Sequence, residues 1–90
     1  MDLNALLTQN LFVAILTREK VLYEGEAKAV TSHNDKGTFD VLPGHANFIS
    51  LINNYIKIHK IDGTEQNIPI VSGILKVFQN RVDIYTGLIR

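Results

Sequence analysis

Short apolar segments separated by polar turn residues run along most of this 90-residue chain. Leu11–Leu16 (LFVAIL) is a continuous apolar run, too short for a helix and rich in β-forming residues. Both of its faces are apolar, which indicates a strand that is covered on two sides. Tyr55–Ile61 (YIKIHKI) instead alternates apolar and polar residues, the period of a half-buried strand. No segment after residue 10 keeps a helical period, so the pattern predicts β structure.

Further strands are expected where short β-rich segments lie between turn residues, at Val21–Tyr23, Ala27–Thr31, Thr38–Leu42, Glu65–Val71, Leu75–Phe78 and Val82–Tyr85. Gly25 separates the first two of these segments and is expected to form a bulge or kink. Pro69 has no backbone N–H, so its part of the strand is expected at a sheet edge or a bulge.

Turn chemistry marks four connections. Thr31–Gly37 (TSHNDKG) is dense in small polar residues and is expected to be a loop. Pro43–Gly44 is a candidate type II turn, because proline fixes φ at the first turn position and glycine accepts a positive φ at the next. Asp62–Gly63 predicts a tight hairpin, and Gln79–Asn80 predicts a second one.

The regular spacing of these turns predicts an all-β fold, a flattened antiparallel β-sandwich or barrel of about ten short strands. Residues 11–88 are expected to form one such domain, preceded by an N-terminal tail at residues 1–10. In that tail, Leu3, Leu6 and Leu7 have helical spacing, so the segment forms either a short helical turn on a partner or a frayed end.

Composition narrows the possible partners. Nine Lys and Arg balance nine Asp and Glu, and a neutral chain lacks the basic face that binds nucleic acid. The chain has no cysteine, which favours a reducing compartment. Asp2 stands where a signal peptide needs positive charge, and no apolar run approaches the roughly 20 residues that span a bilayer. We therefore expect a soluble protein with no direct membrane insertion.

The pattern of chemically reactive side chains does not predict an enzyme. His33, His45 and His59 are not spaced as metal ligands. Ser72 lacks the flanking glycine and the following helix of a nucleophile elbow. Gly73 is expected to serve close backbone packing, and no glycine opens a helix that would cradle a phosphate. We expect no catalytic residue, no metal and no cofactor, which leaves a binding or structural module.

Three motifs then resemble the epsilon subunit of F-type ATP synthase, the subunit called delta in mitochondria. Gly37–Ala46 (GTFDVLPGHA) is similar to a family segment that ends in PGHA. Val71–Val77 (VSGILKV), followed by Asn80–Ile84 (NRVDI), is similar to a second family segment, and Tyr23–Glu26 (YEGE) occupies the place of a frequent YEGE. Their order and spacing agree over residues 11–86.

The resemblance implies a ten-strand β-sandwich in the central stalk of a rotary motor. It implies a non-catalytic rotor subunit that binds the gamma shaft and the c-ring and couples them during proton-driven ATP synthesis. The implied location is the cytoplasmic face of a bacterial inner membrane, or the matrix or stroma side in an organelle, as a peripheral part of a hetero-oligomer.

The resemblance also implies partner-binding residues. Thr38 and His45 match the ring-facing end of the family segment, and the candidates for the gamma side are Thr17, Phe48, Ile49 and Ser50. For His45 the alternative is a turn residue satisfied by nearby backbone. For Phe48 and Ile49 the alternative is ordinary core packing.

Several departures from the family pattern keep other functions open. Thr38 stands where an acidic residue is usual, Asp40 where glycine is usual, and Ile74 where a second glycine is usual. The family's C-terminal helical hairpin is absent from these 90 residues, so neither inhibition of hydrolysis nor ATP binding by that hairpin is expected. The alternatives are a rotor subunit of a diverged F-type-like ATPase that is not coupled to protons, and a stand-alone β-sandwich that binds a ligand such as carbohydrate.

Overall fold

The structure, a computed structural model, describes residues 9–89 and contains seven strands and no helix over that range. The strands are β1 (Leu11–Leu16), β2 (Val21–Ala27), β3 (Ala29–Asn34), β4 (Gly37–Val41), β5 (Phe48–His59), β6 (Glu65–Phe78) and β7 (Arg81–Ile89). Leu3, Leu6 and Leu7, for which a helical turn was one expectation, lie outside the described residues.

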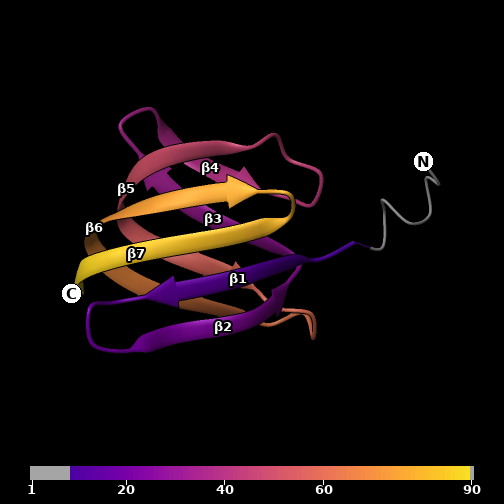
Figure 1. The fold of residues 1–90 in the computed structure, drawn as a ribbon, viewed down its shortest axis with the longest axis horizontal. Coiled ribbons are helices and arrows are strands. Elements are labelled where there is room, and N and C mark those ends of the chain that lie inside the picture. The colour runs from indigo at the N-terminus through magenta and orange to yellow at the C-terminus, as the bar shows by residue number, and fades with distance from the viewer. Residues whose placement is uncertain (1–8, 90) are drawn as a thin grey trace.

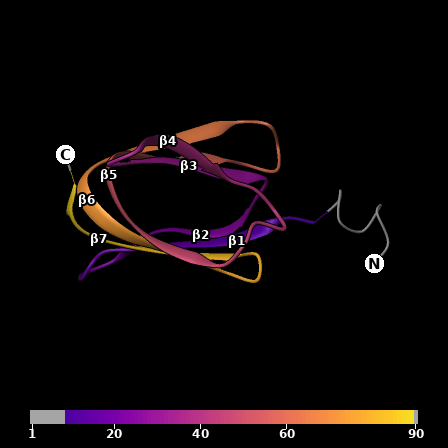
Figure 2. The ribbon, with the colours of Figure 1, turned by 90° about the horizontal axis from the view of Figure 1, so that it is seen from above.

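The seven strands form one sheet in the order β2-β1-β7-β6-β5-β3-β4, which folds over on itself into two layers (Figures 1 and 2). Layer 1 contains β2, β1, β7, the second half of β6 and the first half of β5. Layer 2 contains the first half of β6, the second half of β5, β3 and β4. The predicted all-β sandwich is confirmed, with seven strands in place of about ten. One pair, β1 with β7, is parallel.

The lower strand count follows from two long strands that pass from one layer to the other. The β5–β6 register shifts between Asn53 and Asn54, and Asn54 has a φ of 70°. The β6–β7 register shifts at Ser72, so β6 also bends at this corner. Bulges of this kind bend a strand sharply without ending it. The segments Glu65–Val71 and Leu75–Phe78, which were expected as separate strands, are therefore parts of β6.

The core lies between the layers and is built almost entirely from β-branched and leucine side chains. In layer 1, the inward row crosses three strands in register, from Leu75 of β6 through Ile84 of β7 to Ile15 of β1. The other members of the core cluster are Leu11, Val13, Ala27, Val30, Val41, Ile52, Ile56, Ile58, Ile68, Ile70, Val77 and Val82. Burying such side chains is the main favourable term in folding.

Two local expectations are wrong. β2 runs without interruption through Gly25, which pairs with Val13, and the bulge lies instead at the pairing of Ile15 and Leu16 with β2. The Tyr23 hydroxyl donates to the Glu26 carbonyl (2.9 Å) and so bridges over Gly25, which keeps the strand extended there. The expected loop at Thr31–Gly37 is mostly strand, since small polar residues fit the ladder between β4 and β5.

The turn predictions hold. The His45 N–H donates to the Leu42 carbonyl (3.1 Å) and Gly44 has a φ of 85°, as a type II turn requires. The turn before Thr64 closes β5 onto β6, with Gly63 at φ 89°. Gln79 and Asn80 both have positive φ, the signature of a tight hairpin turn. Pro69 lies where β6 has only β5 as a paired neighbour, in agreement with its expected edge position.

Gly73 is predicted to be intolerant of any side chain. A Cβ at this position would lie 2.9 Å from the Tyr85 carbonyl oxygen, a backbone atom that has no freedom to retreat. We expect Gly73→Ala to destabilise the fold by about 1–3 kcal/mol, because overpacking displaces β7. Gly87→Ala is the matched control, since its Cβ would meet nothing within 4 Å. Chemical denaturation measures both, and equal stabilities of the two variants would contradict the close approach.

The hairpin turn between β5 and β6 gives a prediction about pH. Two bonds from Thr64, its hydroxyl (2.6 Å) and its N–H (2.9 Å), lower the pKa of Asp62 below the ordinary 3.8. A lowered folded-state pKa stabilises the fold above the unfolded pKa, and this stabilisation is lost as pH falls through the folded value. Thr64→Ala should raise the Asp62 pKa in a carboxyl-carbon NMR titration, and Thr64→Ser should leave it low. An unchanged titration in Thr64→Ala would refute the role of the hydroxyl.

Candidate docking surfaces

The outward face of layer 1 is unusually apolar. Pairing places Leu51 beside Ile74, Ile74 beside Tyr85, and Tyr85 beside Leu16, so one row crosses β5, β6, β7 and β1. Neighbouring outward positions on the same strands add more large apolar side chains. The apolar outer face, as we call this surface, consists of Phe12, Leu16, Ile49, Leu51, Ile74, Phe78 and Tyr85.

The side chains of this face are highly exposed and lie next to one another, unlike the isolated hydrophobic residues of an ordinary protein surface. Leu51 is 74% exposed, Ile49 is 68% exposed and Tyr85 is 53% exposed. Isolated exposed apolar residues are normal, but a contiguous group on one sheet face marks an interaction site. The apolar outer face is therefore the surface of this domain that is best suited to contact another protein.

A charged pair interrupts this face. Arg81 donates from its Nε to both carboxylate oxygens of Asp83 (3.1 and 3.0 Å), and its guanidinium lies 5.1 Å from the centre of the Phe12 ring. The hydrogen bonds from Arg81 to Asp83 raise the Arg81 pKa. The two charges of this pair neutralise each other, and the pair presents an arginine beside an aromatic ring, two residue types enriched at protein interfaces. Lys76, which lies between Ile74 and Phe78 on the same face, adds a positive charge.

Two concave regions lie at opposite ends of the apolar outer face. One, of about 390 Å³, is lined by Ile49 and Phe78 with the turn residue Asn47. The other, of about 300 Å³, is lined by Leu16, Thr17 and their neighbours on β7. Thr17 and Ile49, which the sequence proposes for one partner, thus lie on the same side of the domain.

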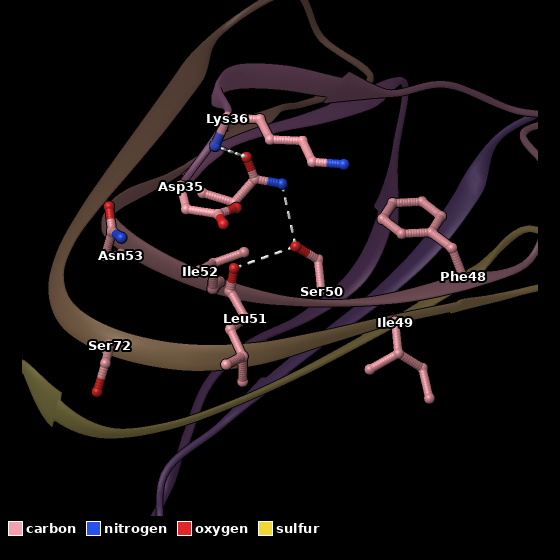
Figure 3. Close-up of a pocket in the computed structure, with 10 residues that line it drawn as sticks. Asp35, Lys36, Phe48, Ile49, Ser50, Leu51, Ile52, Asn53 and Ser72 are labelled. Atoms are coloured by element: carbon pink, nitrogen blue, oxygen red, sulfur yellow. Dashed lines mark hydrogen bonds between the residues drawn. The ribbon is translucent and has the colours of Figure 1, made fainter.

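The remaining shaft-side candidates point elsewhere. Phe48 is half-buried on the inward side of β5, where its ring packs edge-on against Phe39 (6.1 Å between centres). Ser50 accepts a hydrogen bond from Asn34 (3.1 Å), also on the inward side. Figure 3 shows Phe48 and Ser50 on one side of β5, with Ile49 and Leu51 on the other. Only Ile49 of this group belongs to the apolar outer face.

Thr17 is half-buried and has a structural role. Its hydroxyl accepts hydrogen bonds from the backbone N–H groups of Lys20 (3.0 Å) and Glu19 (3.3 Å), and the Thr17 N–H donates to the Lys20 carbonyl (2.8 Å). These bonds close the turn between β1 and β2. A side chain that is satisfied in this way holds the rim of the neighbouring concavity in a fixed shape.

Thr38 and His45, the ring-side candidates, lie at opposite ends of β4, and no hydrogen bond or ring contact joins them among the described residues. Thr38 is exposed at the start of β4, with its hydroxyl 3.4 Å from that of Tyr55. His45 is exposed in the turn after β4, with its ring 4.8 Å from that of Phe48. Asn80 accepts from the Gly44 N–H (2.7 Å), so this turn is held against the β6–β7 turn.

A polar row on the outward side of layer 2 was not predicted. The nearly buried Thr31 hydroxyl donates to Asp40 (2.5 Å) and lies 2.8 Å from Nε2 of His59. Because the single hydroxyl proton goes to the carboxylate, His59 must donate from Nε2 to Thr31. Asp40, which departs from the family's usual glycine, is thus explained by a structural partner. No signal in the sequence alone joins residues 31, 40 and 59.

The described residues offer no site for a metal or a membrane span. Over residues 9–89, no three acidic or histidine side chains come together as metal ligands. No helix in that range is long and apolar enough to cross a bilayer. Within the same range every buried side-chain polar atom has a hydrogen-bond partner.

Comparison with known proteins gives consistent results. The family model described as ATP synthase, Delta/Epsilon chain, beta-sandwich domain matches residues 10–88. The ATP synthase epsilon chain of Bordetella petrii is 39% identical over 73 residues, covering 80% of this chain and 52% of the relative. That of Campylobacter fetus subsp. fetus is 36% identical over 69 residues, covering 76% and 54%. The chain therefore spans about half the length of these curated relatives.

Two solved structures share the fold. A chain in the cryo-EM structure of the Euglena gracilis mitochondrial ATP synthase (OSCP/F1/c-ring) aligns with a TM-score of 0.80 and 19% identity, over 86% of this chain and 50% of that one. A chain in the central stalk/c-ring structure of the Tetrahymena thermophila mitochondrial ATP synthase aligns with a TM-score of 0.71 and 14% identity, over 88% and 64%. The family model matches nearly the whole sandwich, and the fold agrees with it. This chain therefore belongs to the ATP synthase delta/epsilon family and corresponds to the β-sandwich domain of that family.

Proposed function

We propose that this chain is a non-catalytic central-stalk subunit of an F-type ATP synthase, which couples the gamma shaft to the c-ring during proton-driven ATP synthesis. Family membership supports this function, as do relatives named ATP synthase epsilon chain. Residues 11–88 act as one docking domain behind a tail at residues 1–10. The domain works at the periphery of the membrane, on the cytoplasmic side in a bacterium or the matrix or stroma side in an organelle.

The single observation that carries the proposal is the apolar outer face. A free-standing monomer gains nothing from exposing Leu51, Ile49 and Tyr85 to more than half of their full areas. A subunit that is permanently seated against a shaft regains that burial on assembly, at roughly 25 cal/mol per Å² of apolar surface before the costs of association. We assign this face to the gamma shaft, with Thr17 and Ile49 at its two ends. Phe48 and Ser50 support Ile49 from the inner side of β5.

The ring contact is assigned to the exposed residues Thr38 and His45. Thr38 has no charge, so it offers the ring's polar loops a neutral hydrogen bond in place of an ion pair. His45 lies in a turn that is held by backbone and side-chain hydrogen bonds, and its Nδ1 donates to the Ala46 carbonyl (2.9 Å), the backbone contact expected of a turn residue. Only its Nε2 is therefore proposed for the ring contact. A turn held in this way loses little entropy on binding, which favours a lasting contact.

Torque transfer requires a body that does not shear. The two layers of this domain are joined by β5 and β6, which run through both of them, so sliding one layer over the other would break the ladder that holds the core. The proposed role therefore needs no catalytic group from this chain, and ATP chemistry belongs to other subunits of the complex.

A second candidate is a rotor subunit of a diverged complex that is not coupled to protons. The observation that favours it lies in the ring-facing segment. Thr38 there is neutral, and the Asp40 carboxylate accepts a hydrogen bond from Thr31 inside the domain. Affinity purification of the tagged chain from its source cells separates the two candidates. Alpha, beta and gamma subunits with c subunits support the first, the same set without c subunits supports the second, and recovery of neither shaft nor ring refutes both.

Ile74→Lys is predicted to release the shaft. Ile74 lies at the centre of the apolar row and is 46% exposed, so a charge there would be buried without a partner on docking. We expect recovery of the gamma subunit with the tagged chain to fall about tenfold, the equivalent of about 1.4 kcal/mol. Val71→Lys is the matched control, because Val71 is similarly exposed (43%) but lies at the corner outside the apolar outer face. Equal gamma recovery with the two variants would contradict the assigned face.

His45→Ala is predicted to weaken the ring contact selectively. The loss of one hydrogen bond or ring contact of about 1 kcal/mol corresponds to about a fivefold lower recovery of c subunits, with gamma recovery unchanged. Asn67→Ala is the control, because Asn67 is an exposed residue on the outward face of β6 in layer 2. If His45→Ala loses gamma and c subunits together, or neither, the assignment of His45 to the ring is wrong.

A further inference from the structure

The first half of β5 is a free sheet edge. Phe48–Ile52 pair only with β6, and β3 joins the other side of β5 from Asn53 onward. In an antiparallel ladder, alternate backbone N–H and C=O groups point to each side of a strand. In the described part of the chain, those that point away from β6 at Phe48–Ile52 therefore have no partner strand.

A groove of about 650 Å³ runs along this edge (Figure 3). Its far wall is the turn between β3 and β4, and the side chain of Asn34 reaches across to Ser50. The Ser50 hydroxyl also donates to the Leu51 carbonyl (3.1 Å), which keeps a second lone pair for a ladder bond. An extended strand therefore has both space and hydrogen-bonding groups along β5.

Three other sheet edges, at β2, at β4 and along the first half of β6, carry residues that discourage pairing, and this one does not. β2 has Glu24 and Glu26, the exposed part of β4 has Asp40, and the first half of β6 has Pro69. Charged residues and proline are the usual devices that prevent edge-to-edge association. The β5 edge, with the sequence FISLI, has neither. An unprotected apolar edge indicates a strand that has a partner.

We propose that this partner is a second copy of the same chain, joined to the first through antiparallel pairing of the two β5 edges. The segment FISLI is self-complementary in that arrangement: Ser50 faces Ser50, Ile49 faces Leu51, and Phe48 faces Ile52. Every apolar residue lies opposite an apolar residue, and the one polar residue, Ser50, lies opposite Ser50 of the other copy. A two-fold interface requires this property, since the same patch must fit itself.

The charges beside the edge permit the approach of a second copy. Asp35 and Lys36, on the wall of the groove, have opposite signs and sum to zero. The pairing continues layer 1 from one copy into the other, so two sheets become one.

This self-association concerns the isolated chain and does not depend on the proposed place in a central stalk. Its test therefore fails or succeeds separately from shaft and ring recovery.

Sedimentation velocity of the purified chain over a concentration series tests the pairing. A dimer of twice the 10.1 kDa chain mass is expected, with a Kd of about 1–100 μM because the paired segment is short. The double variant Ile49→Lys with Leu51→Lys should be monomeric throughout, since each lysine would face a lysine of the other copy. Ile74→Lys with Phe78→Lys is the matched control, because it adds the same charge to the same face away from the edge, and it should remain dimeric.

Single cysteines test the register, because the chain has no cysteine of its own. Residues directly opposite in an antiparallel pair have Cα atoms about 4.5–5.5 Å apart, within reach of a disulfide. Ser50→Cys should therefore form a disulfide-linked dimer under mild oxidation. Ile49→Cys should not, because the two copies of residue 49 are diagonal neighbours about 7–8 Å apart.

Three outcomes would overturn the pairing. One is a wild-type chain that stays monomeric to about 100 μM, which leaves no self-association of useful strength. Another is loss of the dimer in the control variant at positions 74 and 78, which would mean that the copies associate through the apolar outer face. The third is equal disulfide formation at positions 49 and 50. Circular dichroism of each variant establishes that a loss of dimer is not a loss of fold.

Discussion

The pairing of β5 with β6 is the interaction on which the rest of this molecule depends. All 12 residues of β5 pair with β6, from Phe48 opposite Val77 to His59 opposite Glu65. Because both strands bend at the same corner, this single ladder belongs to both layers. The two layers are therefore joined by backbone hydrogen bonds of this ladder as well as by the packing of side chains between them.

The same ladder decides which side chains of β5 and β6 face outward. Side chains alternate along a strand, so the inward positions Phe48 and Ile52 require that Ile49 and Leu51 face outward. In β6, the bulge at the corner inverts the alternation: Ile68 and Ile70 are buried before it, and Leu75 and Val77 after it. Without this inversion, Ile74 would point into the core and the apolar outer face would lose its centre.

The inversion also explains what the sequence can and cannot predict. Turns are encoded by two adjacent residues, so Pro43–Gly44, Asp62–Gly63 and Gln79–Asn80 are predicted correctly from local chemistry. A strand with a bulge follows no single period, so β6 is predicted as two strands. Thr31–Gly37 is predicted as a loop because the sequence does not show what its polar side chains bind. In the structure Thr31 forms hydrogen bonds with Asp40 and His59.

The candidate site depends on residues that only the fold brings together. The row from Leu51 to Leu16 joins four strands that are distant in sequence, and β1 is apolar on both faces, so no pattern distinguishes its inward side. The motifs identify the family, and with it Thr38 and His45, but they contain few residues of the apolar outer face.

Ile49 and Leu51 belong both to the apolar outer face and to the free edge of β5, so one short segment serves two surfaces. The two surfaces are at right angles, one presenting side chains and the other presenting backbone groups. A shaft that covers the side chains leaves the backbone edge available only if the shaft does not extend past β5. The isolated chain has no such obstacle, so edge pairing is favoured before assembly. Pairing would also shield an apolar segment that lacks the protective charges and proline found at the edges of β2, β4 and the first half of β6. Under the proposed function, the shaft contact would therefore compete at Ile49 and Leu51 only with a weak self-association of the chain.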